Sequence, residues 1–304
     1  MREHLILWLL SIVACSVAQV NLAQNIETGR LMTDMAVLSS DSLEGRGIGT
    51  EGGEKARQYI SARFAEAGVK AFSNGWFQPF SVIHPIKLKK LHGQNVMGWI
   101  EGSVSPDEFI VVSSHYDHLG NINGEIYNGA DDNASGTCAL IALAEYFQRN
   151  PPQMSVILVA FDGEETGLIG SKHFVANPPV GVETILLDIN LDMIGRNVSN
   201  EIYVCGKLHY PTILNLLDDL GTTTFLKVSF GHDGEDGKED WTFSSDHANF
   251  HRAKIPFIYF GEEDHPDYHM PTDELAGIQP DFFTAAVELV LTTYLIMEKA
   301  LLEE

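Results

Sequence analysis

The sequence predicts an α/β protein, a three-layer sandwich in which helices flank a mixed, mostly parallel central sheet. Two observations lead to this fold class. Stretches of β-type residues alternate with amphipathic helical stretches along most of the chain. In addition, segments such as 156–161, with the sequence Val-Ile-Leu-Val-Ala-Phe, are apolar on both faces, which is typical of strands buried in the middle of a sheet.

The expected elements follow one another without an internal repeat or a low-complexity linker. The expected helices are residues 26–39, 51–68, 134–148, 168–176, 211–220 and 280–302. The expected strands are residues 95–101, 108–114, 154–162, 185–192, 201–205 and 255–261. Between the first two helices, residues 44–52 contain G-x-G-x-x-G, but no strand precedes them, so we interpret them as a loop and not as a dinucleotide site.

Composition and charge exclude several classes of protein. The 304 residues include 19 Lys and Arg against 42 Asp and Glu, for a formal net charge of −23. A hydrophobic content of 44% is that of a folded protein. Because nucleic acids and anionic membranes are bound through clustered basic residues, we expect neither as a partner.

The N-terminus has the layout of a secretory signal. Arg2 precedes an apolar run, residues 5–14, which is too short to span a membrane. Residues 1–18 are therefore predicted to be a signal peptide, with Gln19 the first residue after cleavage. Alternatively, residues 12–15 resemble a bacterial lipobox, in which case Cys15 would carry a lipid anchor. Either route predicts an exported protein, periplasmic or extracellular, without a membrane span.

Two cysteines, Cys138 and Cys205, remain after the signal. Two cysteines in apolar stretches do not make a disulfide scaffold, so we expect both to be buried free thiols.

Five short segments carry metal-ligand residue types at or near the ends of expected strands, where open α/β sheets bind ligands. The segments are residues 114–118, 129–136, 161–167, 190–195 and 267–273. Each signal alone is weak, but Glu164 and Glu165 directly follow the most apolar strand, where two carboxylates repel each other unless a cation is present. Together the segments offer two histidines, three carboxylates and a spare glutamate. That inventory suits two zinc ions sharing one carboxylate.

These segments resemble the di-zinc aminopeptidases of metallopeptidase family twenty-eight, over about residues 38–292. The resemblance implies the zinc-dependent exopeptidase fold and two zinc ions per chain. It assigns His115 and Asp192 to one zinc, Glu165 and His269 to the other, and Asp132 as the bridge between them.

The resemblance also implies catalytic roles. Glu164 would be the general base for a water held between the metal ions, and Tyr268 would stabilise the transition-state oxygen. Asp117 would orient the first metal histidine from outside the metal site. The peptide bond between Asp132 and Asn133 is expected to be cis.

Other segments receive no ligand role. Five histidines match no ligand position and are interpreted as ordinary, namely His118, His209, His232, His251 and His265. Residues 245–250 resemble a further family segment near the site, without an assigned role. The acidic stretch 232–240 lacks the spacing of a calcium loop, so a surface loop is the favoured interpretation and a weak calcium site is the alternative. The interval from Gly53 to Ser114 is too short for a protease-associated insert, so residues 19–304 are expected to form one catalytic domain.

The sequence therefore predicts an exported aminopeptidase acting on peptides with a free N-terminus. One alternative is a glutaminyl-peptide cyclotransferase, a mono-zinc enzyme of similar fold with similar His-Tyr-Asp and Glu-Glu segments. The other alternative is a catalytically dead binding module, although such modules lose ligands and this chain retains the full matched set.

Overall fold

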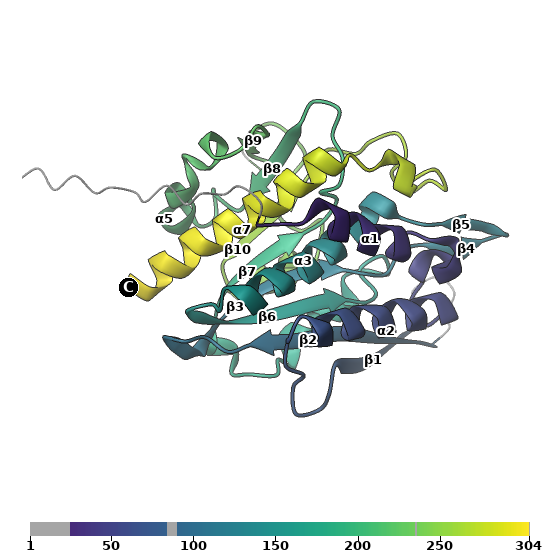
Figure 1. Ribbon diagram of the computed structural model, residues 1–304, viewed down its shortest axis with the longest axis horizontal. Coiled ribbons are helices and arrows are strands. Elements are labelled where there is room, and N and C mark those ends of the chain that lie inside the picture. The colour runs from purple at the N-terminus through teal and green to yellow at the C-terminus, as the bar shows by residue number, and fades with distance from the viewer. Residues whose placement is uncertain (1–24, 84–89, 235, 304) are drawn as a thin grey trace, which may run out of the picture.

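The computed structural model describes residues 25–83, 90–234 and 236–303, so the predicted signal peptide and lipobox lie outside the described residues. Within them, eight strands form one sheet and two more form a separate hairpin, β4 (Gly120–Ile122) with β5 (Glu125–Tyr127) (Figure 1). The strands of the main sheet are β1 (Phe77–Ile83), β2 (Lys90–Ile100), β3 (Ser105–His115), β6 (Met154–Phe161), β7 (Ile185–Leu191), β8 (Glu201–Cys205), β9 (Lys227–Phe230) and β10 (Phe257–Gly261).

The sheet has the order β1-β2-β6-β3-β7-β10-β8-β9. Its centre, β6-β3-β7-β10, is parallel throughout. Strand β2 runs antiparallel to β1 and β6, and β8 runs antiparallel to β10 but parallel to β9. The predicted mixed, mostly parallel sheet is confirmed.

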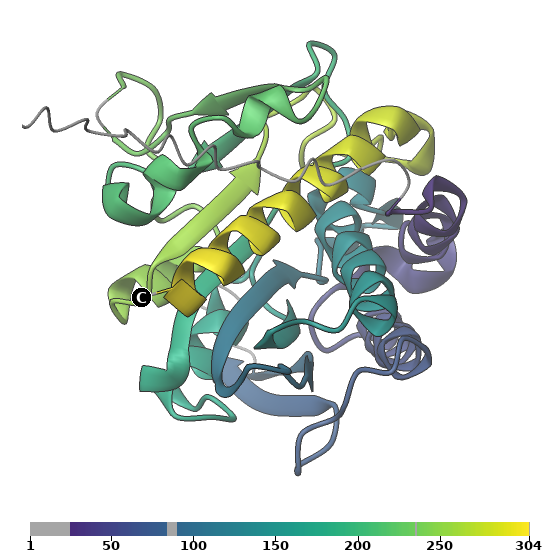
Figure 2. The same cartoon turned by 60° about the vertical axis from the view of Figure 1, so that its left-hand side comes forward.

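Helices cover both faces of this sheet (Figures 1 and 2). The helices are α1 (Thr28–Leu38), α2 (Glu51–Glu66), α3 (Gly136–Arg149), α4 (Ile169–Ala176), α5 (Pro211–Leu214), α6 (His247–Arg252) and α7 (Pro280–Glu303). Helices α1, α2, α3 and α7 pack together on one face, while α4 and α6 pack on the other. This arrangement gives the three layers that the sequence predicts.

Side chains of the central strands point alternately to the two faces of the sheet, and so they fill both interfaces between the sheet and its helices. On β3, Val112 packs into the large core beneath α3, while its neighbour Val111 packs into a second core. Phe174 of α4 and Phe250 of α6 close that second core. Because successive side chains of a strand point to opposite faces, a run of apolar residues serves both cores at once.

Helix α7 also holds the beginning of β6. The buried Glu298 carboxylate accepts hydrogen bonds from the backbone N–H groups of Gln153 and Met154 at 2.7 and 3.0 Å, and from the Tyr294 hydroxyl at 2.8 Å. The last helix of the chain is thus tied to the strand that precedes the Glu164–Glu165 pair.

Some elements differ from the sequence-based expectation. The expected helix 211–220 is broken into α5 and the 3₁₀ turns Asn215–Leu217 and Leu220–Thr222. Strands β1 and β9, the β4–β5 hairpin and helix α6 were not expected. Strand β1 contains Pro79, which cannot donate to a ladder and is tolerated because β1 is an edge strand.

Two further sequence predictions can be compared with the structure. Cys138 and Cys205 are both buried and free, as expected. Of the helices that the structure describes, none is long and apolar enough to cross a membrane.

Candidate metal centre

The parallel centre of the sheet gathers the candidate ligands at one edge. His115 ends β3, Glu164 and Glu165 follow β6, and Asp192 follows β7. Since the carboxyl ends of adjacent parallel strands meet at the same edge, these side chains come together although the sequence separates them. His269 reaches them from the loop that follows β10.

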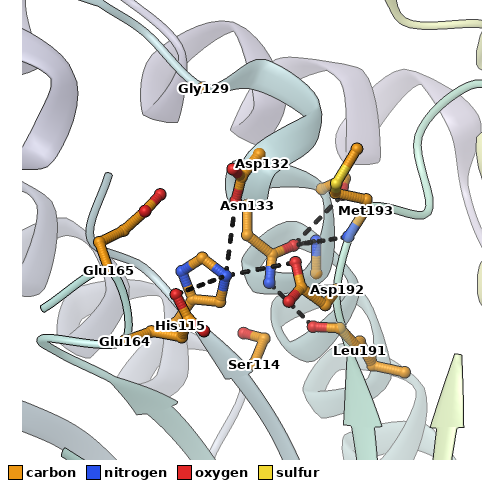
Figure 3. Close-up of polar contacts among 12 residues, drawn as sticks. Ser114, His115, Gly129, Asp132, Asn133, Glu164, Glu165, Leu191, Asp192 and Met193 are labelled. Atoms are coloured by element: carbon orange, nitrogen blue, oxygen red, sulfur yellow. Dashed lines mark hydrogen bonds and ion pairs between the residues drawn. The ribbon is translucent and has the colours of Figure 1, made fainter. Parts of the chain in front are cut away.

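The first group of ligand atoms surrounds His115 (Figure 3). Its Nε2 lies 3.2 Å from Asp192 Oδ1 and 4.0 Å from Glu164 Oε2. One ligand atom from each of these three residues lies within 4.8 Å of the other two. His115 Nδ1 faces the backbone oxygen of Asp117 at 3.1 Å. A proton on Nδ1 leaves Nε2 free to bind a metal ion.

Asp132 lies between two groups of ligands. Its Oδ1 is 3.5 Å from His115 Nε2, whereas its Oδ2 is 3.1 Å from His269 Nε2. His269 Nε2 is also 3.3 Å from Glu165 Oε2. Each oxygen of Asp132 therefore faces a different histidine, which is the arrangement of a carboxylate shared between two ions.

The turn that carries Asp132 is held by its neighbours in the chain. Residues Ala130–Ser135 form a π-type turn, and the expected cis peptide bond joins Asp132 to Asn133. The buried Asn133 side chain donates to Leu191 O at 2.9 Å and accepts from Gly136 N at 2.9 Å. Gly129, at φ 53°, leaves no room for a side chain, because a Cβ there would stand 2.0 Å from Asp132 O.

Two buried charged side chains fix this turn from outside. The Asp273 carboxylate accepts from the backbone N–H groups of Asp131 and Asp132 at 3.0 Å. Arg46, which is 1% exposed, donates to the backbone oxygens of Leu38, Tyr116, Asn128 and Gly129 at 2.5–2.8 Å. Arg46 thus joins the segment after β3 to the residues just before Asp132.

Glu164 and Glu165 are adjacent in sequence but differ in surroundings. Burial, and then repulsion from Glu165 and Asp192, raises the pKa of Glu164 well above its usual range even though His115 opposes the shift. Burial alone would also raise the pKa of Glu165, but the neighbouring imidazoles of His118 and His269 lower it strongly. One of the two carboxyls is therefore suited to carry a proton, and the other to remain an anion.

The histidines respond to the same concentration of negative charge. Hydrogen bonds with Asp132 and Glu165 raise the pKa of His269 to about 10. Burial would lower the pKa of His115, but Asp192, Glu164 and Asp132 together raise it well above its usual value.

The donor set fits divalent transition metals. His118 Nδ1 and Glu165 Oε1 are only 2.7 Å apart, yet both are buried atoms without a properly oriented hydrogen bond. A cation held among His118, Asp132 and Glu165 would satisfy both atoms. Imidazole nitrogens mixed with carboxylate oxygens are ligands typical of zinc sites.

A small cavity of about 140 Å³ opens onto this centre. Five side chains of the centre line it, those of His115, Asp132, Glu164, Asp192 and His269. Its remaining lining residues are Met193, Glu239, Trp241, Ser244, Tyr259, Glu262, Asp264 and Tyr268. The Tyr268 ring stacks on that of His269, with centroids 4.0 Å apart. The cavity wall is therefore strongly acidic.

The structure brings together all the residues that the resemblance selected, but Asp117 lies differently from the expectation. Its carboxylate Oδ1 is 3.8 Å from His115 Nδ1 and accepts instead from the backbone N–H of Glu164 at 3.1 Å. The backbone oxygen of Asp117 is thus closer to His115 Nδ1 than the carboxylate is, while the carboxylate holds the backbone of Glu164.

His118 was interpreted as an ordinary histidine, yet the structure places it in the centre. It is fully buried, and its Nδ1 forms a group with Asp132 and Glu165. The signal was present in the sequence: His115 and His118 belong to one His-Tyr-Asp-His segment at a strand end. Strand alternation could not place His118, because β3 ends at His115 and the chain turns there.

The architecture defines a metal-binding α/β protein whose centre lies at the carboxyl edge of a parallel sheet. Residues 95–294 match the model of peptidase family M28, and the chain belongs to that family.

Individual relatives are similar over most of this chain. It is 29% identical to aminopeptidase YwaD of Bacillus subtilis over 258 residues, which cover 80% of this chain and 49% of that protein. The chain therefore spans only about half the length of this curated relative.

Among solved structures, a leucine aminopeptidase precursor from Bacteroides thetaiotaomicron has a TM-score of 0.71 at 18% identity, covering 89% of this chain and 97% of that chain. Glutaminyl cyclase of Porphyromonas gingivalis has a TM-score of 0.72 at 18% identity, covering 90% and 99%. At this identity the two structures show the fold alone.

Proposed function

We propose that this protein is an exported aminopeptidase that holds two zinc ions and removes N-terminal residues from peptides. The observation that carries the proposal is the position of Asp132, whose two oxygens face His115 and His269 separately. His115, Asp192 and Asp132 would hold one ion, and Asp132, Glu165 and His269 the other. When bound, zinc supplies Lewis acidity that acidifies a water and polarises the scissile carbonyl.

Glu164 is the proposed general base. Its Oε2 lies beside the ligand atoms of the first group and lines the cavity. The carboxylate takes the proton of the attacking water and returns it to the leaving amine.

Tyr268 is the proposed oxyanion donor. Burial raises the pKa of its hydroxyl further above neutrality, so the group remains a phenol that can donate a hydrogen bond. A donor directed at developing negative charge is typically worth about 3 kcal/mol of transition-state stabilisation.

The cavity wall supports a substrate with a free N-terminus. Glu239 and Asp264 line the cavity outside the metal ligands, and no lysine or arginine lies among its lining residues. An α-ammonium group is attracted to such a wall, whereas a substrate carboxylate is repelled. This charge distribution favours an aminopeptidase over a carboxypeptidase.

A substrate panel tests the activity. Aminoacyl-arylamides should be hydrolysed by the zinc-loaded enzyme, and both N-acetylation of the same compounds and removal of zinc by a chelator should abolish turnover. Cleavage of acetylated and free substrates at equal rates would refute the aminopeptidase assignment.

Metal stoichiometry separates this function from its nearest alternative. The fold is shared with glutaminyl cyclases, and the alternative function for this protein is that of a mono-zinc cyclotransferase. We expect two tightly held zinc ions per chain, about 3.5–4 Å apart as in two-metal hydrolases. One ion at saturation, together with cyclisation of N-terminal glutamine, would select the cyclotransferase. No turnover in either assay would select a binding module.

Export and domain organisation complete the proposal. The signal-like residues 1–18 support cleavage before Gln19 or lipidation at Cys15, and N-terminal sequencing with mass spectrometry of the processed protein distinguishes the two. The eight strands of the main sheet come from residues between Phe77 and Gly261, which supports a single catalytic domain over residues 19–304.

A further inference from the structure

A second cavity adjoins the metal centre beside Glu165. Its volume is about 630 Å³, whereas the cavity described above measures about 140 Å³. Glu165 stands between the two cavities. Its Oε2 lies 3.3 Å from Nε2 of His269, which lines the small cavity. Its Oε1 lies 2.7 Å from Nδ1 of His118, which lines the large cavity. Both cavities therefore border the same group of candidate ligands.

The walls of the large cavity come from two segments that the metal centre does not use. One is the glycine-rich stretch 44–52, and the other is residues 119–123, at the beginning of the β4–β5 hairpin. A Cβ on Gly45 would stand 2.3 Å from Tyr127 O, and a Cβ on Gly47 would stand 3.3 Å from the Cα of Gly120. Glycine at these positions therefore lets the two segments pack closely against each other.

The glycine-rich stretch also reaches the loop that carries Glu164 and Glu165. Ile48 lines the large cavity, and its Cδ1 lies 3.0 Å from the place that a Cβ on Gly163 would occupy. Gly163 directly precedes Glu164 in the sequence. Thr166, which directly follows Glu165, lines the cavity as well. The large cavity therefore lies directly beside the loop that holds the proposed base.

The two cavities differ in chemical character. The large cavity is lined by four aliphatic side chains, Ile48, Leu91, Leu119 and Ile122. Its two acidic lining residues are engaged at the metal centre, because Asp117 accepts from Glu164 N at 3.1 Å and Glu165 faces the two histidines. The small cavity carries Glu239 and Asp264 outside the metal ligands. The small cavity therefore attracts an ammonium group, whereas the large cavity suits an apolar side chain.

We propose that the large cavity binds the part of a peptide that follows the scissile bond, and that it favours an apolar side chain directly after that bond. The inference rests on the proposed aminopeptidase function. The small acidic cavity suits the N-terminal residue with its ammonium group, so the rest of a longer peptide must extend beyond Glu165. The large cavity is the space that lies there. The substrate class is then oligopeptides with an aliphatic second residue.

Three peptide amides test this preference. They share one N-terminal residue and carry leucine, aspartate or lysine after it, and the amide of the N-terminal residue alone is the reference. In the zinc-loaded wild type, kcat/KM for the leucine peptide should exceed that for each charged peptide by about tenfold, because only the apolar side chain gains from burial against aliphatic walls. Equal values for the three peptides would overturn the proposal. No cleavage of any compound, the reference included, would instead refute the peptidase function and the inference with it.

Substitution of Ile122 provides the second measurement. Ile122 is 40% exposed, so the fold tolerates its replacement. Ile122→Asp should shift the preference toward the lysine peptide, and Ile122→Lys toward the aspartate peptide, each by about fivefold, as expected of a half-exposed ion pair. A purely structural effect would lower kcat/KM for all three peptides alike. An unchanged order of the peptides in both variants would therefore overturn the proposal.

Val104→Asp is the matched control for these variants. Val104 is 62% exposed and precedes β3, whose other end carries His115. The same change from an aliphatic to an acidic side chain should leave the order of the three peptides there as in the wild type.

A crystal structure provides a measurement that does not depend on turnover. Zinc-loaded Glu164→Gln, soaked with the leucine peptide, should show the leucine side chain between Ile48, Leu119 and Ile122. A bound peptide whose second residue lies outside this cavity would overturn the proposal.

Discussion

Glu164 and Glu165 show how one peptide bond separates two chemical roles. Both follow β6, but Glu164 turns toward His115 and the cavity, whereas Glu165 turns toward His118 and His269. The proposed base and the proposed ligand are therefore distinguished only by the direction of their side chains.

Substitution of each glutamate should separate the two roles. Glu164→Gln removes the proton acceptor but no assigned ligand, so metal content should be unchanged while kcat falls by about 10²–10⁴-fold, the usual worth of a positioned base. Glu165→Gln should instead weaken one ion, and added zinc should restore part of the activity. Near-normal turnover by the Glu164 variant would show that the roles are assigned wrongly.

His118 offers a test of a residue that sequence reasoning overlooked. Because its Nδ1 lies 2.7 Å from Glu165 and 3.5 Å from Asp132, His118→Ala should weaken the ion held by Glu165. The expected loss is about 10–100-fold in metal affinity, as for residues that support metal ligands. Zinc titration in a chelator-buffered series measures it, with the exposed His92→Ala as control. Identical affinities in the two variants would return His118 to an ordinary role.

At the scale of the element, the turn before α3 depends on the buried guanidinium group of Arg46. Arg46 satisfies four backbone oxygens, and burial lowers its pKa from the ordinary value. A lysine ammonium cannot reproduce this planar set of donors.

Arg46→Lys should therefore lower the free energy of unfolding by about 2–4 kcal/mol, since buried oxygens lose charged partners. Denaturant titration of the zinc-loaded protein gives the value. Arg30→Lys is the control, because Arg30 forms an exposed ion pair with Glu145 and should change stability by less than about 1 kcal/mol. Equal effects of the two substitutions would show that the Arg46 contacts contribute little.

His247 of helix α6 should make the stability of the fold depend on pH. The ring is fully buried, with Nε2 2.8 Å from Trp241 O, and burial lowers its pKa to about 4. Since the unfolded histidine titrates near 6.5, the unfolded state binds more protons between these values, and stability is lost as the pH falls through this window. The loss between pH 7.5 and 5.0 should be about 2 kcal/mol.

His247→Gln should remove this part of the pH dependence. The free energy of unfolding is measured for variant and wild type at the two pH values, and the difference between the two proteins is compared. Other groups that titrate in the same range are present in both proteins, so their effect drops out of this difference. If the difference in unfolding free energy between wild type and variant does not change with pH, His247 is not the source of this pH dependence.

The elements also show what a sequence can predict. Four of the five ligand segments were identifiable because each follows or ends an apolar strand, so the geometry of parallel strands places them together, whereas the segment 129–136 precedes helix α3. His118 could not be assigned in this way, because it lies in a turn whose direction no periodicity encodes. Strand β1 was not predicted, because Pro79 is a residue that usually interrupts a strand. The predicted helix 211–220 is broken, because Asn215, Asp218 and Asp219 favour turns over a helix interior.

At the scale of the whole molecule, the candidate metal ligands come from segments that lie far apart in sequence. Residues from His115 to His269 meet only when β3, β6, β7 and β10 are aligned, so metal ions should bind the folded chain and not the unfolded one. Chelation should lower Tm, since an ion at 100 times its Kd contributes about 2.7 kcal/mol. Calorimetry of loaded and chelated protein measures the shift, and an unchanged Tm would indicate that the centre holds no tightly bound metal.

The contact between α7 and β6 has a consequence for biosynthesis. Glu298 holds the backbone of Gln153 and Met154 at the start of the strand that leads to Glu164. A ribosome makes β6 long before α7, and until the helix emerges these amides and the adjoining apolar face of the sheet lack their cover. The start of β6 is therefore covered only after α7 has been made, later in synthesis than every segment that carries a candidate metal ligand.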